Sequence, residues 1–244
     1  MFKDTLIISI DFSVNSPAIS LYLNDAIYFY SFFRKKNYTS KSKVLINFLE
    51  KYVDITIIDD LAKGKDFVER NKIEMADAIY LNNTIIKKVI DFIKNNSDNI
   101  KDIILIFEGF SYNSIGNRTI QLVLYQSILR YMFINYLNLS TNNIFIFTPQ
   151  TIKKYVGEKN RNKNKEFMIK NFFSFIQSDT QFKSDWFNHI KENLERYKNY
   201  TINKKHIVKP FDDLVDSFWI LKCFFEYNNE IINSKINNKK NKIN

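Results

Sequence analysis

The sequence predicts an α/β protein with a mixed five-stranded sheet flanked by helices. Three short runs of β-branched and aromatic residues fill positions 5–33 and are separated by turn signals. Two further apolar runs follow later, each bordered by a long segment with helical spacing. Strands joined by hairpins pair antiparallel, whereas strands joined through a helix pair parallel. The order therefore predicts three antiparallel strands followed by parallel ones.

The N-terminal part is expected to form an antiparallel meander. The run "TLIISIDF" at 5–12 predicts a buried strand, and the runs at 17–23 and 26–33 predict two more. Asn24 and Asp25 separate the last two runs, and this dipeptide is typical of a two-residue hairpin turn.

The segment 34–64 has a less regular pattern. A short helix near 41–52 and a strand near 54–58 fit it, and we treat the whole segment as an insertion outside the five-stranded sheet.

The middle of the chain alternates helices and strands. Apolar residues at helical spacing predict one helix over 65–95, long or broken at the asparagine pair 82–83. The continuous apolar runs "DIILIF" at 102–107 and "NIFIFT" at 143–148 predict two central strands buried on both faces. An amphipathic helix over 118–138 connects them.

The C-terminal third contains two predicted helices, at 164–177 and 211–227. The polar and aromatic stretch 178–209 between them has no clear pattern and is interpreted as a second insertion. No repeat and no Pro/Gly linker divides the chain, so residues 1–228 are expected to form a single domain. The Asn/Lys-rich tail 229–244 is expected to be disordered.

Composition excludes several classes of function. The 36 Lys and Arg against 26 Asp and Glu give a formal charge of +10, which favours a polyanionic partner, although an AT-rich genome would produce part of this excess. With only 4 glycines, the chain has neither GxxxxGK nor GxGxxG, so no nucleotide or other small-molecule cofactor is expected. Cys223, His189 and His206 are too few for a zinc site.

The sequence also disfavours a membrane partner. No apolar run approaches the roughly 18 residues of a spanning helix. The N-terminal stretch "MFKDTLIISID" is typical of a first strand and not of a signal peptide. We expect the protein in the cytoplasm, or in a viral factory if its source is a virus.

Four carboxylates stand out by position. Asp11 lies inside the apolar first strand and Glu108 ends the fourth, while Asp213 and Asp216 are three residues apart and project from one face of the last helix. Each has an ordinary structural explanation when taken alone, such as a strand terminus or the first turn of a helix. Together, on this topology, they indicate a site.

Such a cluster suits divalent-cation chemistry. Mg²⁺ prefers carboxylate oxygens and shares its coordination with substrate phosphates. Two such ions activate a water and stabilise the leaving oxygen of a phosphodiester. Clustered acids without a cation would repel one another and shift their pKa values.

The same segments resemble a known family. "IDFSVNSPAI" at 10–19, "ILIFEGF" at 104–110, "KEFM" at 165–168 and "DDLVDSFWI" at 212–220 are similar, in order, to the RuvC-like Holliday junction resolvases, with similarity also to the resolvases of poxviruses and other viruses. This family belongs to the RNase H-like superfamily. The resemblance implies an RNase H-like fold for nearly the whole chain.

The resemblance also implies an activity. Asp11, Glu108, Asp213 and Asp216 match the family's strand aspartate, strand glutamate and D-x-x-D pair, and would be the catalytic and metal-binding residues. It implies a crossover junction endodeoxyribonuclease that uses two Mg²⁺ ions, which Mn²⁺ can replace. It would act as a homodimer and nick two symmetric strands of a four-way junction, in DNA recombination and repair.

The segment 153–170 departs from the family pattern and carries the basic residues. The stretch "VGEKNRNKNKEFM" has Gly157 but no second glycine, and Lys165 matches the family's lysine, with Lys163 as the alternative. A phosphate-binding segment and an ordinary solvated surface both fit this charge. The residues expected to contact DNA are Lys165, Lys163, Arg161, Lys153, Lys154, Arg118 and, by stacking on unpaired bases, Tyr112.

Three alternatives remain beside a junction-resolving endonuclease. One is a nuclease of flaps or branched replication intermediates on the same fold. Another is a non-catalytic scaffold that binds junctions. A sugar-kinase-like ATP enzyme is the third, and the scarcity of glycine disfavours it.

Overall fold

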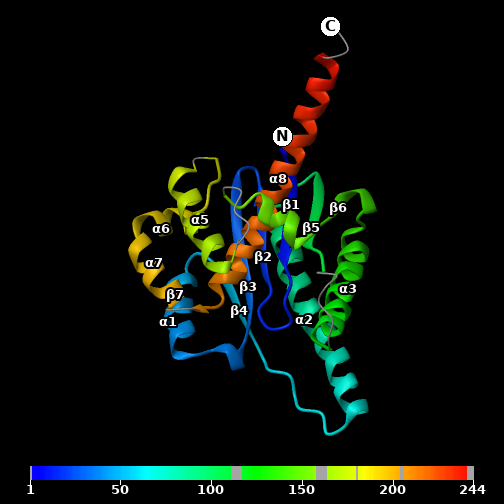
Figure 1. Ribbon diagram of the computed structural model, residues 1–244. Coiled ribbons are helices and arrows are strands. Elements are labelled where there is room, and N and C mark those ends of the chain that lie inside the picture. Colours follow the sequence, from blue (N-terminus) through cyan, green and yellow to red (C-terminus); the bar gives the residue numbers. More distant parts are fainter. Residues whose placement is uncertain (1, 111–116, 158–163, 180, 204–205, 241–244) are drawn as a thin grey trace.

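The computed structural model in Figure 1 describes residues 2–110, 117–157, 164–179, 181–203 and 206–240. The strands are β1 (Thr5–Asp11), β2 (Ala18–Leu23), β3 (Ala26–Arg34), β4 (Asp54–Ile58), β5 (Asp102–Glu108), β6 (Ile144–Phe147), β7 (Ile202–Asn203) and β8 (His206–Ile207). The α-helices are α1 (Ser40–Leu49), α2 (Phe67–Asn95), α3 (Asn117–Leu137), α4 (Pro149–Lys154), α5 (Lys165–Ser178), α6 (Asp185–Glu192), α7 (Leu194–Thr201) and α8 (Phe211–Lys240).

The central sheet has the strand order β4-β3-β2-β1-β5-β6. The first three strands form the predicted antiparallel meander, and Asn24 and Asp25 make its two-residue turn with positive φ angles of 48° and 69°. β4 pairs parallel with β3, β5 with β1, and β6 with β5. The α/β class and the mixed sheet are therefore confirmed.

Two details of the sheet differ from the prediction. The sheet has six strands and not five, because Asp54–Ile58 adds to the free edge of β3 instead of staying outside the sheet. The strand at Ile144–Phe147 is the opposite edge and not a central strand, and Ile146 is accordingly 53% exposed. Short edge strands bury only part of their side chains, so apolar content alone does not distinguish them from central ones.

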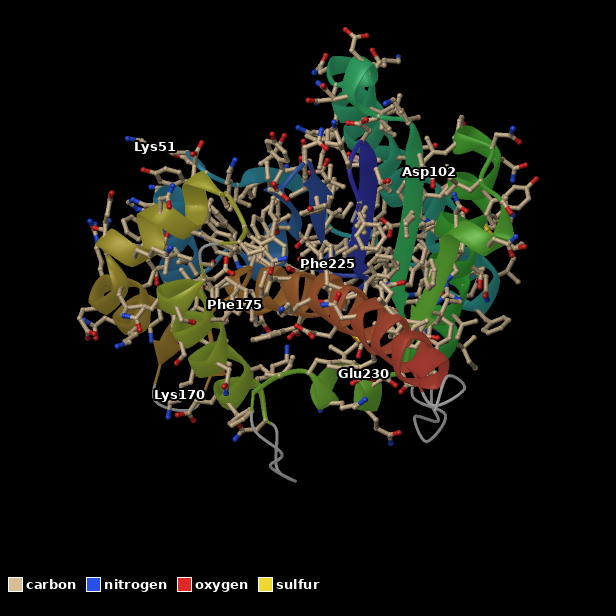
Figure 2. All side chains as sticks on the ribbon, turned by 90° about the horizontal axis from the view of Figure 1, so that it is seen from above. Lys51, Asp102, Lys170, Phe175, Phe225 and Glu230 are labelled. Atoms are coloured by element: carbon tan, nitrogen blue, oxygen red, sulfur yellow. The ribbon has the colours of Figure 1, made fainter. Side chains whose placement is uncertain are left out.

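Helices cover both faces of the sheet (Figure 1). Side chains alternate between the faces of a strand, so Ile7, Ile104 and Ile106 belong to the core under α5, α6 and α8. Ile8 and Leu105 belong to the second core, under α2 and α3. Figure 2, seen from above, shows α8 passing close to the strands in the first of these layers.

Small hydroxyl residues let α8 approach β1 and β2 closely. The Ser9 hydroxyl donates to the Ser217 carbonyl at 2.8 Å, and the Ser20 and Ser217 hydroxyls lie 2.7 Å apart. All three serines are buried. These contacts fix the N-terminal turns of α8 against the strands.

The helices decide one open alternative and correct one prediction. α2 runs unbroken through the asparagine pair, because the buried Asn82 amide donates to the Tyr125 carbonyl of α3 at 2.8 Å and forms an interhelical contact. α8 continues to Lys240, where the sequence predicts a disordered tail, and no Gly or Pro after position 210 interrupts it. None of the helices in the described part of the chain has the length and apolar character required to cross a membrane.

Candidate functional site

Asp11 and Glu108 are the last residues of the neighbouring strands β1 and β5, and both strands end on the same side of the sheet. β1 and β5 are parallel, and Ile10 lies opposite Phe107, so the next residue of each strand is an acid. By strand alternation, Asp11 shares a face with Ile7, and Glu108 shares a face with Ile106. Both carboxylates therefore leave the sheet on the side that α8 covers.

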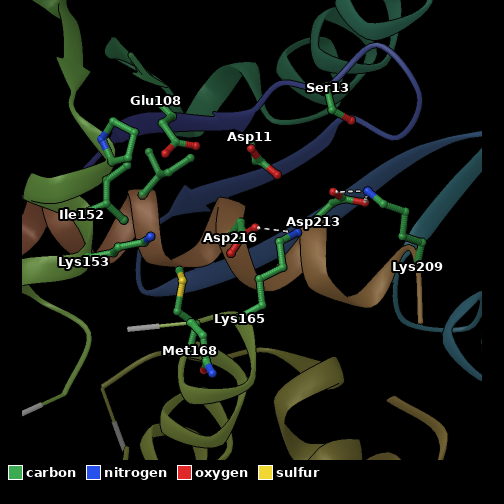
Figure 3. A pocket seen from close by; sticks show the side chains of 13 residues that line it. Asp11, Ser13, Glu108, Ile152, Lys153, Lys165, Met168, Lys209, Asp213 and Asp216 are labelled. Carbon is green, nitrogen blue, oxygen red and sulfur yellow. Dashed lines mark hydrogen bonds and ion pairs between the residues drawn. The ribbon is translucent and has the colours of Figure 1, made fainter. Parts of the chain in front are cut away.

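The first turns of α8 bring the other two acids to this edge. Asp213 and Asp216 lie one helical turn apart and line a cavity of about 550 Å³ together with Asp11 and Glu108. Figure 3 shows the four side chains, from two strands and one helix, directed into this cavity. The structure thus places side by side the four carboxylates that the sequence pattern selected.

Two lysines neutralise part of this negative charge. Lys165, the first residue of α5, places its Nζ 2.7 Å from Asp212 Oδ2 and 3.7 Å from Asp216 Oδ2. Lys209 donates to both oxygens of Asp213, at 2.7 and 2.8 Å. Both lysines line the cavity, as does Lys153 of α4.

A hydroxyl from the loop after β1 also holds Asp213. Ser16 is fully buried and donates to Asp213 Oδ2 at 2.6 Å. The loop that carries Ser16 is held in turn by Arg34, whose Nε donates to the Val14 carbonyl at 3.0 Å. Arg34 is itself fully buried and pairs with Asp77. A chain of polar contacts therefore connects the far side of the sheet to the cavity.

The acids of the cavity resist ionisation. Burial raises the pKa of Asp11 well above its usual range, and repulsion from Asp216, Asp213 and Glu108 adds to this effect. Burial and the neighbouring Asp212 raise the pKa of Asp213 to about 6, against the opposing influence of Lys209 and Ser16.

The same causes act on the other two acids. Burial raises the pKa of Asp216 to about 7, with Lys165 opposing the shift and Asp212, Asp213 and Glu108 adding to it. Burial also raises the pKa of Glu108, while Lys153 and Lys165 lower it. Four acids with raised pKa values share one cavity, so additional positive charge there would stabilise the ionised set.

The chemistry of this donor set fits a divalent cation. The ligands available are carboxylate oxygens, which hard cations such as Mg²⁺ prefer. Among the described residues, Oδ1 of Asp212, the neighbour of Asp213, is buried without a hydrogen-bond partner and has unused acceptor capacity. Within the described residues, no group of three or more His, Cys, Asp or Glu side chains is arranged to hold one metal ion in the conformation shown. In that conformation, lysine ammonium groups contact Asp212 and Asp213.

The structure does not place the remaining residues that were predicted to contact DNA in the described lining of the cavity. Lys154 of α4 pairs with Glu230 of α8 at 2.9 Å and is not among the residues that line the cavity. Arg118 is the second residue of α3, and nothing is described of its side chain. Tyr112, Arg161 and Lys163 lie outside the described residues.

Sequence reasoning missed three participants, namely Ser16, Lys209 and Asp212 as a partner of Lys165. Ser16 and Asp213 are 197 positions apart, so no local pattern links them. The signal for Lys209 was available: a lysine four residues before Asp213, immediately ahead of the acidic helix.

No protein-family model matches the sequence, and no curated protein matches it. Among solved structures, the fold is similar to the crystal structure of the yeast mitochondrial Holliday junction resolvase Ydc2. The two share 14% sequence identity with a TM-score of 0.48, and the match covers 91% of this chain and 78% of that chain. At this level of similarity, a functional conclusion depends on the side chains of the cavity itself.

Proposed function

We propose that this protein is a Mg²⁺-dependent endonuclease that resolves four-way DNA junctions by paired symmetric nicks. The observation that carries the proposal is the convergence of Asp11, Glu108, Asp213 and Asp216 in one open cavity beside lysine side chains. Oxygen ligands for cations and ammonium groups for phosphates are the two requirements of phosphodiester hydrolysis. The acidic helix, with Asp213 and Asp216 in its first turns, supports the same proposal.

In this proposal the four carboxylates would hold two divalent cations, Mg²⁺ or Mn²⁺. The chemistry supplied by these cations is activation of a water and stabilisation of the leaving oxygen. Lys153 and Lys165 line the same cavity and would orient the phosphate by contacting its non-bridging oxygens. Buried Ser16 would keep Asp213 in one orientation through its 2.6 Å hydrogen bond.

Action on a junction also requires two cavities. A four-way junction has twofold symmetry, and a homodimer would present two equivalent sites to two symmetric strands. A monomer would instead nick one strand at a time. Dimerisation is therefore part of the proposal and is measured separately, by sedimentation or light scattering.

The test is cleavage of a labelled synthetic four-way junction by the purified protein, with Mg²⁺ and with a chelator. A linear duplex and a flap of matched sequence serve as comparison substrates, and Asp11→Asn and Glu108→Gln serve as inactive variants. We expect paired nicks on the junction only, with Mg²⁺, and at least about a thousandfold slower cutting by either variant. Both variants should still bind the junction.

Each contrary outcome points to a different function. Faster cutting of the flap would assign the site to general processing of branched DNA. Tight junction binding without cutting in Mg²⁺ or Mn²⁺ would support the scaffold alternative. Mg²⁺-dependent cutting retained by Asp11→Asn would show that the reaction occurs elsewhere.

A further inference from the structure

Lys209 makes the most complete ion pair in the described part of the cavity. Its ammonium donates to both oxygens of Asp213, at 2.7 and 2.8 Å. The Asp213 side chain is 4% exposed, whereas the Lys209 side chain is 37% exposed. Lys209 therefore lies at the surface of the cavity, and its ammonium contacts a carboxylate that is almost completely buried.

This contact compensates a charge that the fold would otherwise leave buried. A buried carboxylate is stable in its ionised form only when it is paired and hydrogen-bonded. Burial disfavours the charge on Lys209, yet Asp213 and Asp212 outweigh this effect and raise the pKa of the lysine. Lys209 thus provides, from within the chain, the positive charge that the cluster needs.

The same contact opposes the binding of a divalent cation. Both oxygens of Asp213 are engaged by the ammonium, and a cation that coordinates Asp213 would lie close to a like charge. Lys165 makes its closest contact to Asp212, with Asp216 at 3.7 Å, and so leaves Asp213 to Lys209. The two positive groups therefore compete for one carboxylate.

We propose that Lys209 is the internal counter-ion of Asp213 and that binding of a divalent cation displaces its ammonium from this carboxylate. The inference rests on the proposed cation-dependent function and deepens it by giving Lys209 a positioning role. In the cation-free protein Lys209 holds Asp213 in place. Once displaced, its flexible side chain can turn toward the mouth of the cavity, where a DNA phosphate would neutralise it.

The test measures cation affinity directly, without DNA. Mg²⁺ is titrated into the full-length protein by calorimetry, comparing wild type with Lys209→Met and Lys209→Gln. We expect both variants to bind Mg²⁺ about tenfold more tightly, because the competing ammonium is gone. Lys209→Gln keeps hydrogen-bond donors and remains informative if Lys209→Met folds poorly, and circular dichroism checks the fold of each.

A matched control is available at another ion pair. Lys88 of α2 donates to both oxygens of Asp54, at 2.9 and 2.7 Å, and its side chain is 36% exposed. Lys88→Met should leave Mg²⁺ affinity unchanged. In an Asp213→Asn background, Lys209→Met should also have no effect on affinity, since the group for which the two cations compete is absent.

Cleavage supplies a second readout. Lys209→Met should reach half-maximal junction cleavage at about tenfold less Mg²⁺ than wild type. If wild type binds Mg²⁺ and cuts junctions but both Lys209 variants bind Mg²⁺ equally or more weakly, this inference is wrong and the proposed function stands. If wild type neither binds Mg²⁺ nor cuts, both are wrong.

Discussion

Replacing Asp216 by asparagine should stabilise the cation-free protein at neutral pH while it abolishes cleavage. Burial, opposed by Lys165 and reinforced by the neighbouring acids, raises the pKa of Asp216 from 3.8 to about 7. Between these two values the folded protein holds a proton that the unfolded chain has lost. Stability must therefore fall as pH rises from about 4 to about 7, and an asparagine side chain, which does not titrate, would not contribute to this fall.

The magnitude follows from the shift. About three pKa units at 1.36 kcal/mol each give about 4 kcal/mol of destabilisation once Asp216 is ionised. Asparagine keeps the shape of the side chain, but its amide needs partners beside Lys165, which offsets part of the gain. We expect a net stabilisation of about 2–3 kcal/mol at pH 8, or about 4–12 °C in Tm, and almost none at pH 4.

The assay is urea unfolding, followed by circular dichroism at pH 4, 6 and 8 in the presence of a chelator. Asp91→Asn, an exposed carboxylate on α2, is the control and should leave stability unchanged at each pH. Added Mg²⁺ should narrow the difference between Asp216→Asn and wild type, because wild type binds the cation more tightly. Loss of stability in Asp216→Asn at pH 8 without cation, or a gain independent of pH, would refute the reasoning.

Three further results are expected. Arg34→Met should lower the free energy of unfolding by about 3–5 kcal/mol, because it leaves Asp77 without its buried partner, and urea unfolding measures this. Ser16→Ala removes a hydrogen bond that favours ionised Asp213, so the loss of cleavage should be larger at pH 6 than at pH 8.5 in a pH–rate profile. Lys165→Met should lower the slope of log affinity against log salt concentration for junction binding by about one, the contribution of one phosphate contact; fluorescence anisotropy at several salt concentrations measures this slope, and an unchanged slope would contradict the role of Lys165.

The strand ends were predictable because the local pattern alone determines them. The apolar run 102–107 stops at Glu108, and Asp11 lies near the C-terminal end of the run 5–12, so both acids are expected at the C-terminal ends of their strands. The helical spacing of Asp213 and Asp216 adds a shared face. Since parallel strands end at the same edge, these few facts bring the four acids together before any tertiary contact is known.

What the sequence did not predict depends on contacts between distant segments. β4 is five residues long with only Ile58 buried, so its apolar pattern cannot show whether it joins the sheet. The contact between Ser16 and Asp213 arises only when the loop after β1 meets the start of α8. The position of Lys209 before the acidic helix is apparent in the sequence, but its contact with Asp213 depends on the direction from which the chain enters the helix.

The acids of the cavity favour the proposed nuclease over a scaffold that only binds junctions. A binder of polyanions gains nothing from Asp11, Glu108, Asp213 and Asp216, since buried and half-buried carboxylates destabilise the fold when they are ionised and repel phosphate. In the proposed function, a bound divalent cation would offset the negative charge of these acids, and the cavity would then favour the approach of a phosphate. Under the proposed function, the excess of basic residues would attract DNA with or without the cation. Junction binding should therefore persist in a chelator, and only the cutting should depend on the cation.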